Sequence, residues 1–297
     1  MLHVPVLLEE SLDFLLHDLS GAYLDLTFGR GGHSQEILRR ISSDGILHAV
    51  DRDIEAVVYA EKNIADPRFS IYHSNYSEID SLFYGLEFDG IILDLGTCST
   101  HLDNPDRGFS FQSNGPLDMR MDTSSGFSAS EWLNSASEEE ISNILYQYGE
   151  EKASKKIAKE IVKFRSIKPL ETTIDLTKII ETVLKRVGKI HPATKSFQAI
   201  RMHVNNELHD LEVALSKMNE ILKVNGVIVV ISFHSLEDRM VKNFFKAKVQ
   251  EFPKDIPINP NVTEVYKCIK KKIKPSSDEI KRNPRSRSAI MRVFSKL

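Results

Sequence analysis

One stretch, from Asp25 to Ser34, constrains the fold of this chain more than any other. It contains three glycines, follows the apolar run 22–26, and precedes the segment 36–41, whose apolar residues have helical spacing. A strand, a glycine turn and a helix in this order form the first unit of the α/β folds that bind nucleotide cofactors. Two of the glycines permit a tight turn, and the third, Gly32, lets the backbone approach a ligand closely.

The next apolar run, 46–50, ends at an acidic residue, Asp51. In such folds an acid at this place, about twenty residues beyond the turn, binds the hydroxyls of a ribose. The turn and the acid together predict a cofactor that contains adenosine. A dinucleotide fingerprint would have a third glycine where this chain has Ser34. That departure, with an acidic motif at Asp94, favours S-adenosylmethionine, and a dinucleotide-dependent dehydrogenase is the alternative.

Short apolar runs alternate with helical stretches along the first third of the chain. We expect strands at 23–26, 46–50, 69–72 and 90–94, with helices at 53–64 and 76–83. The alternation resumes only with a helix at 208–222, which Asn225 and Gly226 terminate, and with strands at 227–231 and 289–294. This order predicts an α/β fold with a wound, mainly parallel sheet of the Rossmann-like type.

The segment between the fourth and fifth strands has a helical pattern of its own. Helical spacing of apolar residues occurs at 137–145, after a capping box, and again at 152–164 and 173–187. We therefore expect a helical insertion at 127–190, within a discontinuous core formed by 1–126 and 191–297. A helical lobe over the carboxyl ends of the strands would form one wall of a substrate cleft.

Composition argues against several classes of protein. The two cysteines, Cys98 and Cys268, form no CxxC pair, which disfavours a disulfide framework and structural zinc and favours a cytoplasmic setting. We expect no signal peptide at 1–19, where charged residues interrupt the apolar ones, and no membrane span. The histidines lack the spacing of metal ligands, so no metal is expected.

Charge is unevenly distributed in a chain whose net charge is only −3. The range 267–297 contains 11 Lys or Arg against 2 acids, a local charge of +9. Within it, Arg285 and Arg287 alternate with serines after a proline, which predicts an extended cationic strip suited to phosphate binding. The alternative is a solvated tail.

A polar motif, Asp94 to Ser99, follows the fourth strand. In a methyltransferase that acts on an amino group, acceptors here can hold the amine and orient its lone pair, and Asp94 and Ser99 are the candidates. An ordinary turn is the alternative. Cys98 within the motif is either a small core residue or the nucleophile of an enzyme that methylates carbon 5 of cytosine.

Three further segments are dense in aromatic, basic and polar residues: 106–122, 191–201 and 232–239. The first is expected to be a loop with exposed aromatic rings and arginines, suited to stacking on bases and to contacting phosphates. The third follows the fifth strand. The candidates for such contacts are Phe109, Phe111, Arg120 and His234, besides the two arginines of the strip.

Together these segments resemble one family closely, the RsmH (MraW) methyltransferases of the bacterial small ribosomal subunit. The resemblance extends from His3 to Ala289, and it includes the glycine turn and the ranges 115–122, 191–194 and 232–239. It implies a class I methyltransferase sheet with an inserted helical substrate domain. It also implies transfer of a methyl group from S-adenosylmethionine to the exocyclic N4 of a cytidine in the decoding region of 16S ribosomal RNA.

The resemblance also implies roles for individual residues. Gly31, Gly32 and His33 would line the methionine end of the cofactor, Asp51 would bind its ribose, Tyr76 would lie against adenine, and Asp94 would adjoin the amino acid and methyl group. The expected reaction is direct attack by N4 on the sulfonium methyl, with the target base taken out of its stack. An RNA-binding assembly factor without catalysis is a further alternative.

The chain departs from the family pattern in one place. His101 stands where the family has a cofactor-contacting Gln, and it keeps the ability to form a hydrogen bond. Cys98 stands where Ser is usual, which argues against an essential nucleophile.

Overall fold

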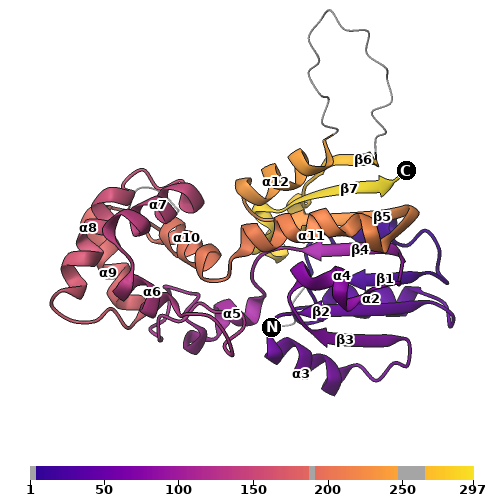
Figure 1. The fold of residues 1–297 in the computed structure, drawn as a ribbon, viewed down its shortest axis with the longest axis horizontal. Coiled ribbons are helices and arrows are strands. Elements are labelled where there is room, and N and C mark those ends of the chain that lie inside the picture. The colour runs from indigo at the N-terminus through magenta and orange to yellow at the C-terminus, as the bar shows by residue number, and fades with distance from the viewer. Residues whose placement is uncertain (1–4, 187–190, 247–264) are drawn as a thin grey trace, which may run out of the picture. The chain divides into compact units, whose positions relative to one another are not determined.

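The computed structural model describes residues 5–186, 191–246 and 265–297. The chain forms two compact units (Figure 1). Met1–Gly96 and Asp210–Leu297 contain the β-sheet and are called the sheet unit here. Thr97–His209 is called the helical unit. Each unit has a hydrophobic core of its own.

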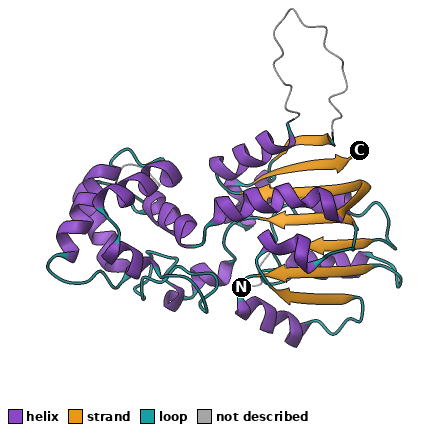
Figure 2. Cartoon of the chain, viewed as in Figure 1, coloured by secondary structure: helices purple, strands orange, loops and turns teal. Residues whose placement is uncertain are grey.

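A seven-stranded sheet lies at the centre of the sheet unit (Figure 2). Its strands are β1 (Ala22–Asp25), β2 (Ile46–Asp51), β3 (Phe69–His73), β4 (Phe88–Asp94), β5 (Leu222–Ser232), β6 (Tyr266–Ile273) and β7 (Ile290–Lys296). Their order is β3-β2-β1-β4-β5-β7-β6, in which β1 to β5 are parallel and β7 is antiparallel to both of its neighbours. The predicted Rossmann-like α/β fold is confirmed.

Apolar side chains cover both faces of the central strands, as expected for parallel strands that are buried on both sides. On one face Leu93 belongs to the same core cluster as Leu215 of α11 (Glu207–Ile221). On the other face Ile92 clusters with residues of α1 (Leu8–Leu15) and α2 (Gly32–Arg40). The sheet unit also contains α3 (Ile54–Asn63), η1 (Tyr76–Glu78), α4 (Ile79–Leu82), α12 (Ser235–Phe245), α13 (Ser277–Arg282) and η3 (Pro284–Ser288).

Two features of this sheet differ from the sequence prediction. Helix α11 ends at Ile221, and Asn225 and Gly226, predicted to terminate it, lie inside β5. The strand β6 was not predicted, because its lysine-rich sequence lacks the apolar alternation of a strand. It lies at the edge of the sheet, where lysines discourage pairing with other chains.

The helical unit consists of α5 (Ser99–Asp103), η2 (Pro105–Arg107), α6 (Ala129–Ser135), α7 (Glu138–Gly149), α8 (Ser154–Arg165), α9 (Thr173–Val183) and α10 (Thr194–Val204). The predicted capping box at Ser137 is present at the start of α7. The core of this unit includes Trp132, Leu145 and Ile161, together with Ile200 of α10.

The helical unit extends beyond the range 127–190 that the sequence indicated for an insertion. Asn205 explains part of this difference. Its Oδ1 accepts a hydrogen bond from the Met121 N–H at 2.7 Å, and its Nδ2 donates to the Met119 carbonyl at 2.7 Å. The loop before α6 is therefore tied to the end of α10, so both pack with the helices between them. Residue 187, at the end of one predicted helix, lies outside the described residues.

Within the described ranges, no helix is both long enough and apolar enough to cross a membrane.

Candidate functional site

The parallel strands bring acidic side chains together at their carboxyl ends. Asp25, Asp51 and Asp94 are the last residues of β1, β2 and β4, and β1 lies between the other two strands. The carboxyl ends of parallel strands are where ligands bind in such sheets. The sequence predicted two of these three acids as site residues.

Asp94 is the most unusual of them. Its side chain is 20% exposed, and its buried Oδ1 has no hydrogen-bond partner among the described residues. Burial raises the pKa of Asp94 well above its usual value, and the nearby carboxylates of Asp25 and Glu237 raise it further. A carboxyl group whose ionised form is disfavoured in this way favours a cationic ligand, because a cation would compensate both the burial and the repulsion.

Asp25, unlike Oδ1 of Asp94, has hydrogen-bond partners that fix its carboxylate. Its buried carboxylate accepts hydrogen bonds from the Ser34 hydroxyl at 2.7 Å and from the Thr27 N–H at 3.0 Å. Burial raises the pKa of Asp25 to about 6, although these hydrogen bonds oppose the shift. Ser34, in the place of a fingerprint glycine, thus orients an acid of the strand before it.

His33 joins the glycine turn to Asp94. Its Nε2 lies 3.2 Å from the Val6 carbonyl oxygen, which can only accept, so Nε2 carries a proton. Its Nδ1 lies 3.8 Å from Oδ2 of Asp94. The backbone therefore fixes the orientation of the imidazole beside the acid.

The turn requires glycine for reasons that the structure shows. Gly31 has φ of 72°, and a Cβ there would lie 2.6 Å from Cζ of Phe28. A Cβ on Gly32 would lie 2.2 Å from Cγ of Pro5. The sequence pattern predicted that a ligand would approach Gly32 closely, whereas the atom that approaches it in the structure belongs to Pro5.

The carboxylate of Asp51 is fixed by two backbone amides. Oδ2 accepts from the Gly29 N–H at 2.7 Å and Oδ1 accepts from the Asp53 N–H at 2.8 Å. A carboxylate accepts hydrogen bonds from hydroxyl groups, so Asp51 is of a type that can bind a ribose. The donors also connect this acid directly to the glycine turn.

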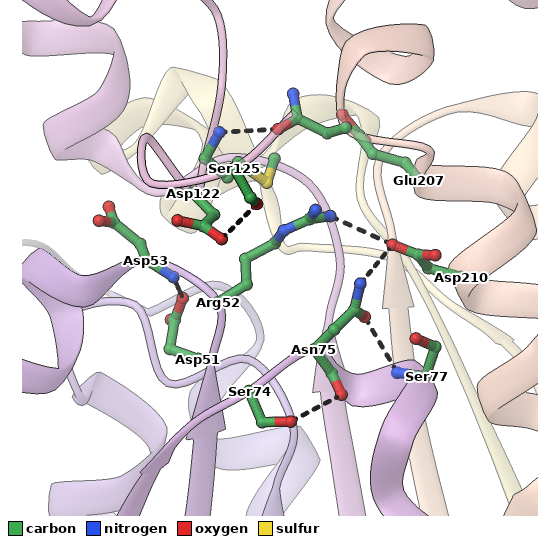
Figure 3. A network of polar contacts seen from close by, with 12 residues as sticks. Asp51, Arg52, Asp53, Ser74, Asn75, Ser77, Asp122, Ser125, Glu207 and Asp210 are labelled. Atoms are coloured by element: carbon green, nitrogen blue, oxygen red, sulfur yellow. Dashed lines mark hydrogen bonds and ion pairs between the residues drawn. The ribbon is translucent and has the colours of Figure 1, made fainter. Parts of the chain in front are cut away.

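Tyr76 lies in a turn that α11 holds at two points. Asn75 caps this turn by accepting from the Ser77 N–H at 3.0 Å, and its Nδ2 donates to Asp210 of α11 at 2.6 Å. Arg52, next to Asp51, also reaches Asp210, at 3.2 Å (Figure 3). Asp210, 6% exposed, thus connects the segment expected to bind ribose with the segment expected to contact adenine.

Lys217 provides the second point of attachment. Its Nζ donates to the Ser77 carbonyl at 2.8 Å and to the Asp80 carboxylate at 2.7 Å. The turn that presents Tyr76 is therefore attached to two side chains of one helix.

Ser99 and His101 belong to the helical unit, whereas the site residues described so far belong to the sheet unit. Both lie in α5. The ring of His101 is buried and stacks on Phe109, with 4.8 Å between ring centroids. Burial raises the pKa of the neighbouring Cys98, but hydrogen bonds from His101 and Thr100 outweigh this effect and the pKa lies below its usual value.

The aromatic residues expected to be exposed are largely covered. Phe109 is buried, which contradicts the expectation of an exposed ring, and Arg107 lies over it with 6.0 Å between Cζ and the ring centroid. Phe111 is half-buried, stacks on His191 at 4.5 Å and meets Phe197 edge-on. Both rings contribute to packing in the helical unit.

Arg120 and His234, the two basic candidates outside the C-terminal strip, each contact an acidic side chain. Arg120 forms a two-pronged ion pair with Asp118, with hydrogen bonds of 2.9 and 2.8 Å. His234 precedes α12 as its N-cap, and its Nε2 lies 3.0 Å from Oε1 of Glu237.

Arg285 and Arg287 are both exposed. They lie in the 3-10 helix η3, which follows α13, so the expected extended conformation of the strip is wrong. Asn283 explains the local structure, because its Oδ1 accepts from the Arg285 N–H at 3.2 Å and Pro284 occupies the first turn.

Comparisons with known proteins show the family of this chain. A model of the MraW methylase family matches residues 1–297. The "Ribosomal RNA small subunit methyltransferase H" of Ruthia magnifica subsp. Calyptogena magnifica is 46% identical over 302 residues, which cover 99% of this chain and 98% of the relative. The protein of the same name from Nitrosomonas europaea is 45% identical over 310 residues, which cover 100% and 98%.

Among solved structures, an rRNA methylase from Streptococcus thermophilus aligns over 100% of this chain and 99% of its own, with a TM-score of 0.45 and 11% identity.

Proposed function

The chain belongs to the MraW methylase family, and from this premise we propose that it methylates the 16S RNA of the small ribosomal subunit. The target that we propose is the exocyclic N4 of a cytidine in the decoding region. S-adenosylmethionine is the methyl donor of the family. The relatives named above, which carry the name of small-subunit ribosomal RNA methyltransferases, support the class of substrate.

The observation that carries the proposal is the unpartnered, buried Oδ1 of Asp94. S-adenosylmethionine supplies an activated methyl group, and its methionine end carries an ammonium and a sulfonium beside one carboxylate, a net charge of +1. A carboxylate that is destabilised by burial and by two other acids is well suited to a ligand with this charge. We propose that Asp94 holds the positively charged end of the cofactor, with His33, Gly31 and Gly32 beside it.

The same sheet unit contains groups suited to the remainder of the cofactor. We propose that Asp51 binds the ribose hydroxyls and that Tyr76 lies against the adenine ring.

Asp94 and Ser99 are the proposed acceptors for the amino group of the target base, and His101 is a further proposed cofactor contact. The proposed RNA contacts are Phe111, Arg120, His234, Arg285 and Arg287, and the buried Phe109 is left out. Among them the exposed Arg285 and Arg287 are the best placed to contact phosphates.

The substrate proposal is tested by mapping modified cytidines in 16S RNA by mass spectrometry. RNA from a strain that lacks this gene is expected to lose one N4-methyl group from the decoding region, and expression of the gene should restore it. An unchanged N4-methyl signal in the deletion strain would refute the proposed substrate. We also propose that the protein acts in the cytoplasm on RNA within the small subunit.

Methylation at carbon 5 of cytosine is the second candidate, because the lowered pKa of Cys98 favours a thiolate nucleophile. We expect Cys98→Ser to keep methyl transfer within a few-fold of the wild type, since attack by N4 requires no protein nucleophile. Transfer of tritium from labelled S-adenosylmethionine to RNA measures this rate. Cys268→Ser, a change at an exposed cysteine of the sheet unit, is the matched control. Loss of transfer in Cys98→Ser alone would favour the carbon-5 mechanism.

A further inference from the structure

A hollow of about 570 Å³ lies on the surface of the helical unit. Residues of α7 line it together with residues 152–156, of which 154–156 form the start of α8. Tyr146 contributes an aromatic side chain that is 62% exposed. None of the residues proposed above for cofactor binding or methyl transfer lines this hollow.

Three lysines, Lys152, Lys155 and Lys156, line the hollow and are exposed. In the part of the chain that the structure describes, none of the three forms an ion pair or a side-chain hydrogen bond, so their charges are available to a ligand. The acidic neighbour Glu151 is buried, and its carboxylate accepts from the Ala153 N–H at 2.9 Å. The charged side chains that line the hollow are all lysines.

The stability of α8 does not account for these lysines. Lys155 and Lys156 occupy its first turn, where the positive end of the helix dipole favours acids and disfavours cations. The first turns of α6, α7 and α9 each contain acids, whereas that of α8 contains none. The residue before α8, Ala153, also provides no side-chain cap. Two cations thus stand where they weaken their own helix.

We propose that this hollow binds the backbone of the RNA substrate, with the lysines on phosphates and Tyr146 stacked on an unpaired base. This inference rests on the proposed function, because it takes RNA as the substrate. Cationic side chains beside an exposed ring are the combination with which proteins hold single-stranded RNA without selecting its sequence. Phosphate contacts set the position of a protein on its target and leave the choice of base to other residues.

The test uses the full-length protein with 16S RNA transcribed in vitro as the probe. Lys155→Glu/Lys156→Glu is expected to weaken RNA binding by about tenfold or more, and to reduce the slope of log K against log salt by roughly 1 to 2. Tyr146→Ala should also weaken binding, and Tyr146→Phe should restore it because stacking needs only the ring. Lys178→Glu/Lys185→Glu, which makes the same charge change at exposed lysines outside the hollow, is the matched control.

Misfolding can be separated from loss of binding by thermal unfolding. Glutamates in the first turn of α8 complement the helix dipole, so Lys155→Glu/Lys156→Glu should unfold at the same temperature as the wild type or higher. RNA affinity equal to that of the wild type in this variant would overturn the inference. So would equal losses in the variant and in the control.

Methyl transfer distinguishes this inference from the proposed function. If the proposed function is correct, the wild type transfers tritium from labelled cofactor to the RNA, and the lysine variant does so with a raised KM for RNA and an unchanged KM for cofactor. A wild type without transfer would refute the function itself. A variant that keeps its KM for RNA but loses binding to phosphatidylglycerol vesicles would assign the hollow to membranes instead, against the inference.

Discussion

Asp94→Asn is expected to lower the affinity for S-adenosylmethionine by roughly 10- to 100-fold, since hydrogen bonds to a charged group contribute about 1.5–3 kcal/mol. The amide keeps the shape of the side chain and removes its charge, so the loss measures the attraction between Asp94 and the cationic cofactor. Isothermal titration calorimetry of the purified protein gives this affinity directly.

Two further titrations sharpen the interpretation of Asp94→Asn. S-adenosylhomocysteine keeps the ammonium of the cofactor and lacks its sulfonium charge. If Asp94 contacts the ammonium, the variant loses affinity for both compounds equally, whereas a selective loss for S-adenosylmethionine assigns Asp94 to the sulfonium. Asp89→Asn, at the opposite end of β4, is the matched control, because Asp89 accepts from Lys223 and the Ala22 N–H. If Asp94→Asn binds both compounds with wild-type affinity, Asp94 does not contact the cofactor.

The raised pKa of Asp94 predicts that the affinity for S-adenosylmethionine increases with pH. Only the ionised carboxylate attracts a cation, so the affinity of the wild type should rise with pH until Asp94 is ionised, and this rise should be absent in Asp94→Asn. The stability of the free protein changes in the opposite direction. An acid with a raised pKa contributes stability below its unfolded pKa of 3.8, and this contribution is lost as the pH rises through the folded value.

We expect the ionisation of Asp25 to lower the stability of the protein in a defined pH range. With a folded pKa of about 6 against 3.8, its contribution disappears between about pH 4 and pH 6.

The sequence predicted those parts of the site that depend on where strands end. Asp51 and Asp94 follow apolar runs, and the carboxyl ends of parallel strands meet at one edge of the sheet. Asp25 stood in the same glycine-rich stretch but was not selected, because its role depends on the hydroxyl of Ser34 across a turn. Glu237 was not selected for a similar reason, since it affects Asp94 only through their proximity in the folded chain.

Features that depend on residues distant in sequence could not be predicted from local patterns. Phe109 has the residue type of an exposed stacking platform, and only the fold shows that His101 covers it. The limits of the helical unit also depend on partners far apart in sequence, such as Asn205 and the loop at Met119 to Met121. Local sequence patterns predict helices and strands. They do not predict contacts between segments that are far apart in the sequence.

Asp210 is the residue whose importance the fold reveals most clearly, and Asp210→Ala is expected to raise the KM for S-adenosylmethionine by about tenfold. Its carboxylate holds Arg52, beside the proposed ribose acid, and Asn75, which caps the turn of Tyr76. Removing it leaves two half-buried donors without this acceptor, at a cost of about 0.5–1.5 kcal/mol for each lost hydrogen bond. Because Asp210 acts through these neighbours and touches no reacting atom, kcat at saturating cofactor should stay within a few-fold.

Steady-state kinetics of methyl transfer separate this positioning role from a general loss of stability. Glu212→Ala removes an exposed acid from the same helix and should leave KM unchanged. Asp210→Asn should recover part of the affinity, since its amide oxygen still accepts from Asn75 but no longer pairs with the charge of Arg52. If Asp210 acts through Asn75, the losses in Asp210→Ala and Asn75→Ala will be less than additive when the two changes are combined. Fully additive losses, or an equal fall in kcat, would show that Asp210 supports the fold of α11 and not the cofactor segments.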